Sequence, residues 1–426
     1  MATKPRTHID YTVGWICALP KELIAAAAML DETHQDLPRQ PNDHNSYTLG
    51  RVGVHNVVVA CLPKGKIGNN NAATVAARMT STFPSIKFGL MVGIGGGVPK
   101  SVRLGDVVVS TPTDEFGGVV QWDFGKVQQE GTFKRTGALN CPPTELLSAL
   151  TKIEKEHTMK GSKIPQYLKD METNWPRLAP KYTRSKSLKD MLFKADCKHI
   201  ENTEESQEKY DDEEEDEEDE EEEEGNYCIH CDQTKIICRK PRDMRVHYGL
   251  IASGNLVVKD ALFRDEINKT LGGKVLCFET EAAGLMNDFP CLIIRGICNY
   301  ADAHKNKNWQ EHAAAVAAAF AKELLLLVPA QEVEQMPTIK QLENQLERVS
   351  NAVNEIRSHQ RDYQRDQEYQ TIIDWLTPMN YATQQNDFIA QRQEGPGEWV
   401  LKIKRISALA QADQSDSFLS WYARSG

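Results

Sequence analysis

The chain has 426 residues, a hydrophobic content of 40% and a formal net charge of -11 at pH 7. The unbroken acidic run 211–224 accounts for this charge, so the remainder is nearly neutral and is not predicted to bind nucleic acid. The N-terminus has no apolar signal core, and no uncharged stretch reaches transmembrane length. The ten cysteines are too dispersed for a secreted disulfide scaffold. We therefore expect a soluble cytoplasmic protein without a membrane partner.

Two parts of the chain alternate short apolar runs with helical patterns. In the first part, 9–157, the runs predict strands at 12–17, 57–62, 88–93 and 107–110 and helices at 20–30 and 69–82. In the second part, 245–330, they predict strands at 247–252 and 291–295 and helices at 280–288 and 311–327. Continuous apolar strands between helices indicate a mostly parallel sheet covered on both faces. The predicted fold class is therefore α/β, a three-layer sandwich with a mostly parallel central sheet.

The segment between these parts, 158–244, is predicted to be an insertion in one domain. It is rich in Lys, Glu and Asp, and its acidic run 211–224 buries too little apolar surface to offset chain entropy, so that run is expected to be disordered. Cys228 and Cys231 form a CxxC pair, which is half of a common zinc site. Cys197, His199 and Cys238 lie nearby without the spacing of a second half. Incidental reduced thiols are the preferred interpretation, and no cofactor is expected.

The C-terminal part changes character after Pro329. Within the linker 331–366, apolar residues alternate at spacings of three and four, at Ile339, Leu342, Leu346, Val349, Val353 and Ile356. This seam predicts a short coiled coil, and hence a homo-oligomer; a single helix laid against the chain's own core is the alternative. The tail 367–426 mixes helical and polar residues and is expected to be only marginally stable alone.

Acidic residues suited to sugar chemistry stand in the second part of the chain. Glu279, Thr280 and Glu281 open the predicted helix 280–288, and the next apolar strand ends near Asn299 and Asp302. Cleavage of an N-ribosidic bond passes through an oxocarbenium-like transition state, which a carboxylate near the ribose stabilises. Glu281 suits that role because a carboxylate accepts hydrogen bonds from both ribose hydroxyls. Glu279 either supports it or faces away. The alternative is a carboxylate that complements the helix dipole.

These segments, taken in order, resemble the superfamily of purine nucleosidases and nucleoside phosphorylases. The run Trp15-Ile16-Cys17-Ala18-Leu19-Pro20-Lys21-Glu22 is similar to the family's opening strand and helix. In the hydrolytic branch, the glutamate at the position of Glu22 activates the attacking water. The phosphorolytic branch carries an Arg near this position to hold phosphate, and none occurs at 11–30, which favours hydrolysis. The resemblance thus implies a nucleoside phosphorylase-like fold and a catalytic role for Glu22.

Further segments of the resemblance imply residues that bind the substrate. The glycine-rich run that starts at Gly93 resembles the turn that closes over the ribose or its phosphate, where glycines let backbone N–H groups approach an anion. The segment 250–255 resembles the strand and turn that line the base pocket, and Val257 stands where many relatives have an aromatic residue. The implied substrate-binding residues are Gly93, Ile94, Gly95, Gly96, Ser253, Val257, Glu279, Thr280 and Asp302.

Asn299 departs from the family pattern, which has Asp as the acid for the leaving base. An amide donates a hydrogen bond to a purine nitrogen but transfers no proton at ordinary pH. Loss of a general acid typically lowers a rate by ~10² to 10⁴. Asn299 is compatible with a weakened enzyme, with a nucleotide-binding module, or with a site that uses Asp302 instead. Asp302 has the alternative role of a structural cap for the loop that follows.

The resemblance extends to one branch of the superfamily, the nucleosidase-like effector domain that precedes a NACHT-type NTPase in intracellular immune-type receptors. Trp375-Leu376-Thr377-Pro378 and the polar segments that follow resemble the lead into that NTPase. This branch implies hydrolysis of ATP and related nucleotides to adenine and a ribose phosphate. The expected function is N-ribosyl hydrolysis of purine nucleosides or nucleotides. Two alternatives remain: a purine nucleoside phosphorylase, and a non-catalytic module that senses nucleotides and oligomerises.

Overall fold

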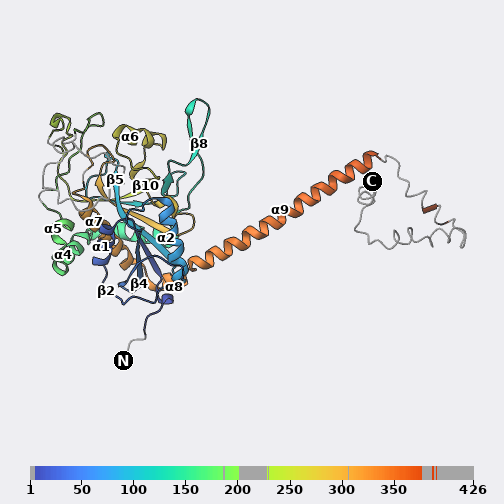
Figure 1. The fold of residues 1–426 in the computed structure, drawn as a ribbon, viewed down its shortest axis with the longest axis horizontal. Helices are drawn as coiled ribbons and strands as arrows, with labels where there is room; N and C mark the ends of the chain where they lie inside the picture. Colours follow the sequence, from blue (N-terminus) through green and yellow to red (C-terminus); the bar gives the residue numbers. More distant parts are fainter. Residues whose placement is uncertain are drawn as a thin grey trace, which may run out of the picture. The chain divides into compact units, whose positions relative to one another are not determined.

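The computed structural model describes residues 5–185, 188–200, 228, 230–305, 307–376, 386, 387 and 390. Residues up to 347 form one compact unit, and residues from 348 onward form another. The first unit alternates strands and helices along the chain, as the sequence predicts (Figure 1). Its strands are β1 (Val13–Cys17), β2 (Glu32–Thr33), β3 (Tyr47–Val52), β4 (His55–Cys61), β5 (Phe88–Gly97), β6 (Val107–Ser110), β7 (Val119–Gln121), β8 (Gly125–Val127), β9 (Phe133–Arg135), β10 (Val246–Ser253), β11 (Val275–Glu279) and β12 (Cys291–Asn299).

The helices of the chain lie mainly between these strands and after β12. They are α1 (Pro20–Ala28), α2 (Asn69–Thr82), α3 (Thr144–Lys160), α4 (Ile164–Asn174), α5 (Ala179–Tyr182), α6 (Ala261–Thr270), α7 (Gln310–Leu327), α8 (Ala330–Gln335) and α9 (Ile339–Leu376). Short 3₁₀ turns are η1 (His8–Asp10), η2 (Gln129–Gly131), η3 (Gln233–Lys235) and η4 (Ala282–Gly284). This order of elements agrees with the α/β class predicted from the sequence.

The described strands other than β8 and β9 join one sheet in the order β11–β10–β6–β12–β5–β1–β4–β3–β2, with β7 beside β10. The central pairs β1–β4, β1–β5, β5–β12, β6–β10 and β10–β11 are parallel. The end of β11 also pairs antiparallel with β5, where Cys277 and Phe278 oppose Gly97 and Gly96. This extra pairing closes a ring of five strands, β11, β10, β6, β12 and β5. It brings Glu279, the last residue of β11, beside the glycine-rich end of β5.

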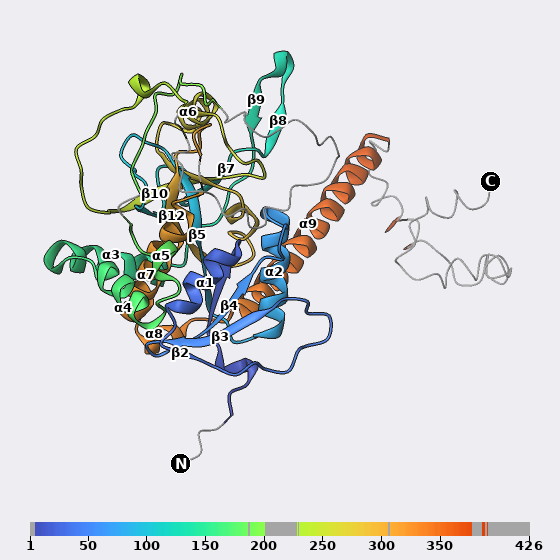
Figure 2. The ribbon, with the colours of Figure 1, turned by 60° about the vertical axis from the view of Figure 1, so that its left-hand side comes forward.

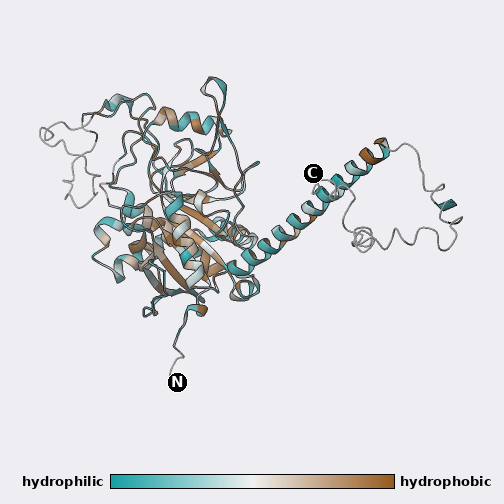
Figure 3. Ribbon diagram, turned by 45° about the vertical axis from the view of Figure 1, so that its right-hand side comes forward, coloured by the Kyte–Doolittle hydropathy of each residue, from teal (hydrophilic) through white to brown (hydrophobic). Residues whose placement is uncertain are grey.

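Alternate strand residues face two separate layers of helices, as period-two side-chain geometry requires. Val13, Trp15 and Cys17 of β1 belong to the core shared with α1 and α7, whereas Ile16 belongs to the core shared with α2. Figure 2 shows α1 and α7 on one side of the strands and α2 on the other. Hydrophobic colour concentrates on the central strands and the helix segments beside them (Figure 3). The three-layer arrangement is therefore confirmed.

Two local expectations are wrong, and both concern the candidate site. The helix predicted at 280–288 is only the 3₁₀ turn η4, so Glu281 does not open an α-helix. Gly284 explains this, because a Cβ there would overlap the Asn69 carbonyl of α2, and the segment bends to follow that contact. The glycine-rich run from Gly93 is not a turn but the end of β5, which pairs with β12 as far as Asn299, with a register shift between Ile297 and Asn299.

The predicted insertion 158–244 begins with folded helices. α4 and α5 pack against α7, and the Tyr182 hydroxyl donates a hydrogen bond to the Lys21 carbonyl at 3.0 Å. The acidic run 211–224 and nearly all of the tail beyond residue 376 lie outside the described residues. The seam from Ile339 to Ile356 lies on α9, as a helix was predicted, and its coiled-coil pairing stays a prediction.

Within the described residues, no single helix has both the length and the apolar character needed to cross a membrane. By length and composition alone, the bent combination of α7 with α8 and α9 passes that test. In α7, however, the Ala-rich stretch is buried in the protein core.

Close contact between β12 and α7 generates a stability prediction. A Cβ at Gly296 would overlap the backbone carbonyl of Ala313, which cannot rotate away. We expect Gly296→Ala to lower the free energy of unfolding by about 1–3 kcal/mol, as overpacked cores do. The matched control is Gly14→Ala. Its Cβ would meet the flexible Met79 side chain at 2.9 Å, so this variant should lose less unfolding free energy. Urea unfolding of both variants measures the difference, and equal losses would contradict the explanation.

Candidate active site

Glu22 is fixed at the start of α1 by backbone hydrogen bonds. Its Oε2 accepts from the N–H groups of Ala18 at 2.7 Å and Leu19 at 3.0 Å, because the helix begins at Pro20 and leaves these donors unpaired. Its Oε1 accepts from the N–H of Ile94 in β5 at 2.7 Å. Glu22 is 3% exposed. The carboxylate therefore bridges the opening helix and the glycine-rich end of β5.

Glu279 and Glu281 surround the buried guanidinium of Arg295. Nη2 of Arg295 pairs with Glu279 Oε2 and lies 3.3 Å from Glu281 Oε2. Glu279 also accepts from the backbone N–H groups of Glu281 at 3.1 Å and Ala282 at 3.0 Å. Glu281 Oε1 accepts from the Thr280 hydroxyl and from the N–H of Gly68, at 3.3 Å, where α2 begins. Glu279 thus orients the segment, and Glu281 is the carboxylate with fewer backbone partners.

Gly93 lets Glu22 approach Arg295. A Cβ at Gly93 would overlap both Glu22 Oε1 and Arg295 Nη1, so these two groups occupy the space beside its Cα. Arg295 Nη1 and Nε are buried and have no hydrogen-bond partner among the described residues. The sequence therefore brings Glu22, Glu279, Glu281 and Arg295 into one cluster. An unpartnered guanidinium N–H beside a carboxylate oxygen suits a water molecule or a ligand oxygen.

Burial and neighbouring charge set the proton affinity of this cluster. Burial raises the pKa of Glu281 to about 7, against the lowering effect of Arg295 and with a further increase from Glu279. Burial likewise raises the pKa of Glu22, although Arg295 and the backbone N–H groups oppose it. Burial disfavours the Arg295 charge, but the three carboxylates outweigh that effect and raise its pKa. Arg295 is therefore a permanent cation, and Glu281 can take up or release a proton near neutral pH.

Asn299 and Asp302 lie at the end of β12 and in the loop that follows. Asn299 is buried, its Oδ1 accepts from the Ala301 N–H at 2.9 Å, and its Nδ2 donates to Cys298 Sγ at 3.1 Å. Asp302 accepts from the His304 N–H at 3.1 Å, and burial raises its pKa. Both residues line a small cavity with room for about 20 Å³, enough for an ordered water.

The remaining predicted residues are divided between the cluster and the protein surface. Ser253 is fully buried, and its Oγ accepts from the Ala283 N–H at 2.9 Å beside the amide of Asn69. Ile94, Gly95 and Gly96 lie in β5, next to Glu22 and Asn299. A Cβ at Gly96 would lie 2.8 Å from Asn299 Oδ1. Val257 is 45% exposed in the loop after β10, outside the buried cluster.

Sequence reasoning missed Arg295 and Asn69 as site residues. Arg295 is fully buried at the centre of β12, and a charged residue inside an otherwise apolar strand was the available signal. Asn69 Oδ1 accepts from the Gly284 N–H at 3.2 Å and so connects α2 to the turn after Glu281. Its signal was weaker, because polar residues often open helices.

The raised pKa of Glu281 generates a prediction about stability and pH. A carboxyl whose pKa is higher in the folded protein stabilises the fold below the ordinary value of 4.5, and this contribution is lost as pH rises through about 7. We expect the unfolding free energy of the wild type, minus that of Glu281→Gln, to fall by about 2–4 kcal/mol between pH 4.5 and 8. Urea unfolding across this range measures it. A flat difference for Glu281→Gln would contradict the assignment.

Comparison with known proteins identifies sequences that are similar to this chain. The model of the phosphorylase superfamily matches residues 12–160. A nucleotide-binding leucine-rich repeat (NLR)-like protein of Hyaloscypha variabilis is 44% identical over 329 residues, which are 76% of this chain and 30% of that protein. A 5'-methylthioadenosine/S-adenosylhomocysteine nucleosidase of Mycobacterium bovis is 30% identical over 123 residues, 28% of this chain and 41% of that protein. The chain thus spans less than half the length of these relatives.

Two solved structures of lower similarity were also found. A 5'-methylthioadenosine/S-adenosylhomocysteine nucleosidase of S. pneumoniae is 17% identical with a TM-score of 0.45, over 75% of this chain and all (100%) of that one. A futalosine hydrolase of Helicobacter pylori is 14% identical with a TM-score of 0.45, over 75% of this chain and 99% of that one. The match to the phosphorylase superfamily thus lies within residues 12–160.

Proposed function

We propose that this chain hydrolyses the N-ribosidic bond of purine nucleosides or nucleotides. The observation that carries the proposal is the meeting of Glu22, Glu281 and Arg295 beside Gly93. A nucleosidase needs a negative group beneath the ribose and an activated water at the anomeric carbon. Glu281 supplies the first and Glu22 the second. The nucleosidases among the similar proteins support this class of reaction.

In the proposed reaction, the Glu281 carboxylate accepts hydrogen bonds from the two ribose hydroxyls. As the bond to the base lengthens, positive charge grows on the ribose, and the nearby carboxylate stabilises it. A water molecule held between Glu22 Oε1 and Arg295 Nη1 attacks the anomeric carbon and gives its proton to Glu22. Arg295 orients this water through its free N–H and keeps Glu22 close, and Glu279 holds the guanidinium in place.

The departing purine is assigned to the Asn299 end of β12. Asn299 Nδ2 contacts a purine nitrogen when it turns from the Cys298 thiol, but it donates no proton to the base. Asp302 is buried, its pKa is raised, and it lines a small cavity together with Asn299. It is therefore the nearest candidate acid. We therefore expect turnover below that of relatives with Asp at this position.

The purine preference and ATP as the substrate are further parts of the proposal. The 44% identity to an NLR-like protein supports the role of an effector domain, for which release of adenine from ATP is the proposed output. Lys64, Lys66 and Arg103 lie in loops of the same domain and carry the positive charge that a triphosphate needs. The homo-oligomer and the cytoplasmic location stay predictions from the sequence.

Replacement of either carboxylate tests the proposed roles. We expect Glu22→Gln and Glu281→Gln to lower kcat/KM about 10² to 10⁴-fold, because each removes a group that acts in the transition state. Chromatography of adenosine, 5'-methylthioadenosine and ATP, with and without phosphate, measures free adenine and the sugar product. Glu154→Gln, an exposed carboxylate on α3, is the control and should keep full activity.

Three outcomes of this assay separate the alternatives. Undiminished release by Glu281→Gln would falsify the assignment of the ribose site. Product that requires phosphate and contains ribose 1-phosphate would identify a phosphorylase. Binding without product would identify the sensing module, which Asn299 specifically favours because it cannot act as an acid.

Restoring an acid at position 299 tests the departure from the family pattern. We expect Asn299→Asp to raise kcat about 10-fold or more, since a carboxyl group can protonate the leaving base. Asp302→Asn in the wild-type background should remove the residual activity if Asp302 supplies the proton. Unchanged rates in both variants, measured by adenine release, would show that base protonation limits neither protein.

A further inference from the structure

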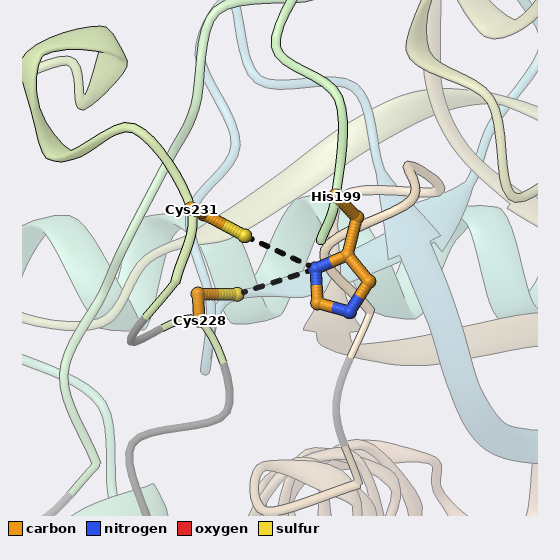
Figure 4. Close-up of side chains that lie close together, drawn as sticks. All are labelled: His199, Cys228 and Cys231. Carbon is orange, nitrogen blue, oxygen red and sulfur yellow. Dashed lines mark hydrogen bonds between the residues drawn. The ribbon is translucent and has the colours of Figure 1, made fainter. Parts of the chain in front are cut away.

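The insertion carries a cluster of metal-ligand side chains outside the proposed ribose site. His199, Cys228 and Cys231 come from segments that are about thirty residues apart in sequence, and their ligand atoms lie within 4.8 Å of one another. Figure 4 shows both thiols directed toward Nδ1 of His199. Both cysteines are buried, at 2% and 3% exposure. The structure therefore supplies the histidine that the CxxC pair lacked in the sequence.

The distances in this cluster fit a tetrahedral ion. The His199 Nδ1 atom lies 3.3 Å from Cys231 Sγ and 3.8 Å from Cys228 Sγ. Zinc with ordinary bond lengths and tetrahedral angles separates a nitrogen and a sulfur ligand by about 3.6 Å. The two separations lie on either side of that value. An ion at the centre requires only small side-chain movements.

Hydrogen bonds around the cluster hold the CxxC turn in place. The Ile200 N–H donates to Cys231 Sγ at 3.5 Å, and the Cys231 N–H donates to the Cys228 carbonyl at 3.2 Å. Gln233 Nε2 donates to the carbonyls of Cys228 and Cys231, at 2.8 and 3.1 Å. These contacts close the CxxC turn and aim both sulfur atoms to one side. Such supporting hydrogen bonds orient ligands and tune a metal site.

The small size of the local core gives an independent reason for a metal. Segments 191–197 and 231–237 pair through a bridge between Phe193 and Ile236, with hydrogen bonds from Lys194 to Lys235 and from Ile237 to Leu192. Among the residues that the structure describes, their shared core contains only Phe193, Cys228 and Cys231, with Cys197 and Ile236 packed against it. Such a core buries too little apolar surface to hold two loop segments together, and a structural zinc ion commonly supplies the difference.

We propose that His199, Cys228 and Cys231 bind a structural zinc ion, and that Cys197 completes the tetrahedral set. Cys197 stands two residues before His199 and packs on the same cluster, with its Sγ now 3.8 Å from the Lys198 carbonyl. As the fourth ligand, Cys197 would have to exchange this contact for the ion. The resulting pattern is C-x-H followed by C-x-x-C, with nitrogen and sulfur donors that suit zinc.

The proposed zinc ion fixes one wall of the cavity at Asn299 and Asp302. Phe193 and Cys228 line that cavity together with His304, and the Phe193 ring stacks on His304 at 4.0 Å between centroids. The insertion thus reaches the loop after β12 through a contact next to the cluster. Loss of the ion is expected to loosen this wall, whatever reaction the domain performs.

Metal analysis of the full chain tests the proposal. Protein purified from zinc-supplemented cells should contain about one zinc ion per chain, as a four-ligand structural site does. The Cys228→Ser, Cys231→Ser double variant and His199→Ala should lose it, Cys197→Ser should hold it more weakly, and the exposed Cys238→Ser control should retain it. Because a variant can fail to fold, cobalt is also exchanged into the wild type, where thiolate-to-cobalt absorption must appear.

The opposite results are equally clear. Wild-type protein that binds neither zinc nor cobalt would overturn the proposal, as would a double variant that keeps its zinc. A Cys228–Cys231 disulfide found by mass spectrometry in protein purified without reductant would identify a redox pair instead. Full zinc affinity in Cys197→Ser would exclude Cys197 as the fourth ligand. A chelator should also increase proteolysis at 188–200 and 230–240, and unchanged cleavage would contradict a structural role.

Discussion

The buried guanidinium of Arg295 is the constraint on which the site depends. It lies at the centre of β12 and compensates Glu22, Glu279 and Glu281, which would otherwise repel one another in a medium of low dielectric constant. A buried cluster of this kind rarely stabilises a fold better than well-packed apolar side chains. Its presence in the core is therefore better explained by chemistry than by stability.

The topology of the sheet brings the four charged residues together. Glu22 follows β1, Glu279 ends β11, Glu281 follows it, and Arg295 lies in β12, so these residues come from separate parts of the sequence. Parallel pairing places the carboxyl ends of β1, β5 and β12 at one edge, and the extra pairing of β11 with β5 closes that edge. Gly93 leaves the space that the charged groups fill. Ligand sites at this edge are common in α/β proteins.

Local patterns predicted the elements better than the contacts. Helix 69–82 and strand 107–110 agree with α2 and β6 residue for residue, because clear apolar periods and a polar start define them. The helix at 280–288 was wrong, because the approach of Gly284 to the Asn69 carbonyl is a tertiary contact that no local pattern reveals. The pairing of His199 with the CxxC turn was missed for the same reason, whereas Arg295 was missed although a charge within an apolar strand was a local signal. Glu22 was predicted through the family resemblance and Glu281 from the chemistry of a carboxylate beside a ribose, whereas their positions beside Arg295 required the fold.

The most direct test is a crystal structure of the chain with a non-hydrolysable adenosine analogue that carries a positive charge on its sugar ring. The account predicts both sugar hydroxyls within hydrogen-bond distance of the Glu281 carboxylate, and an ordered water that touches Glu22 and Arg295. A ligand bound elsewhere, or a sugar that contacts neither carboxylate, would contradict it.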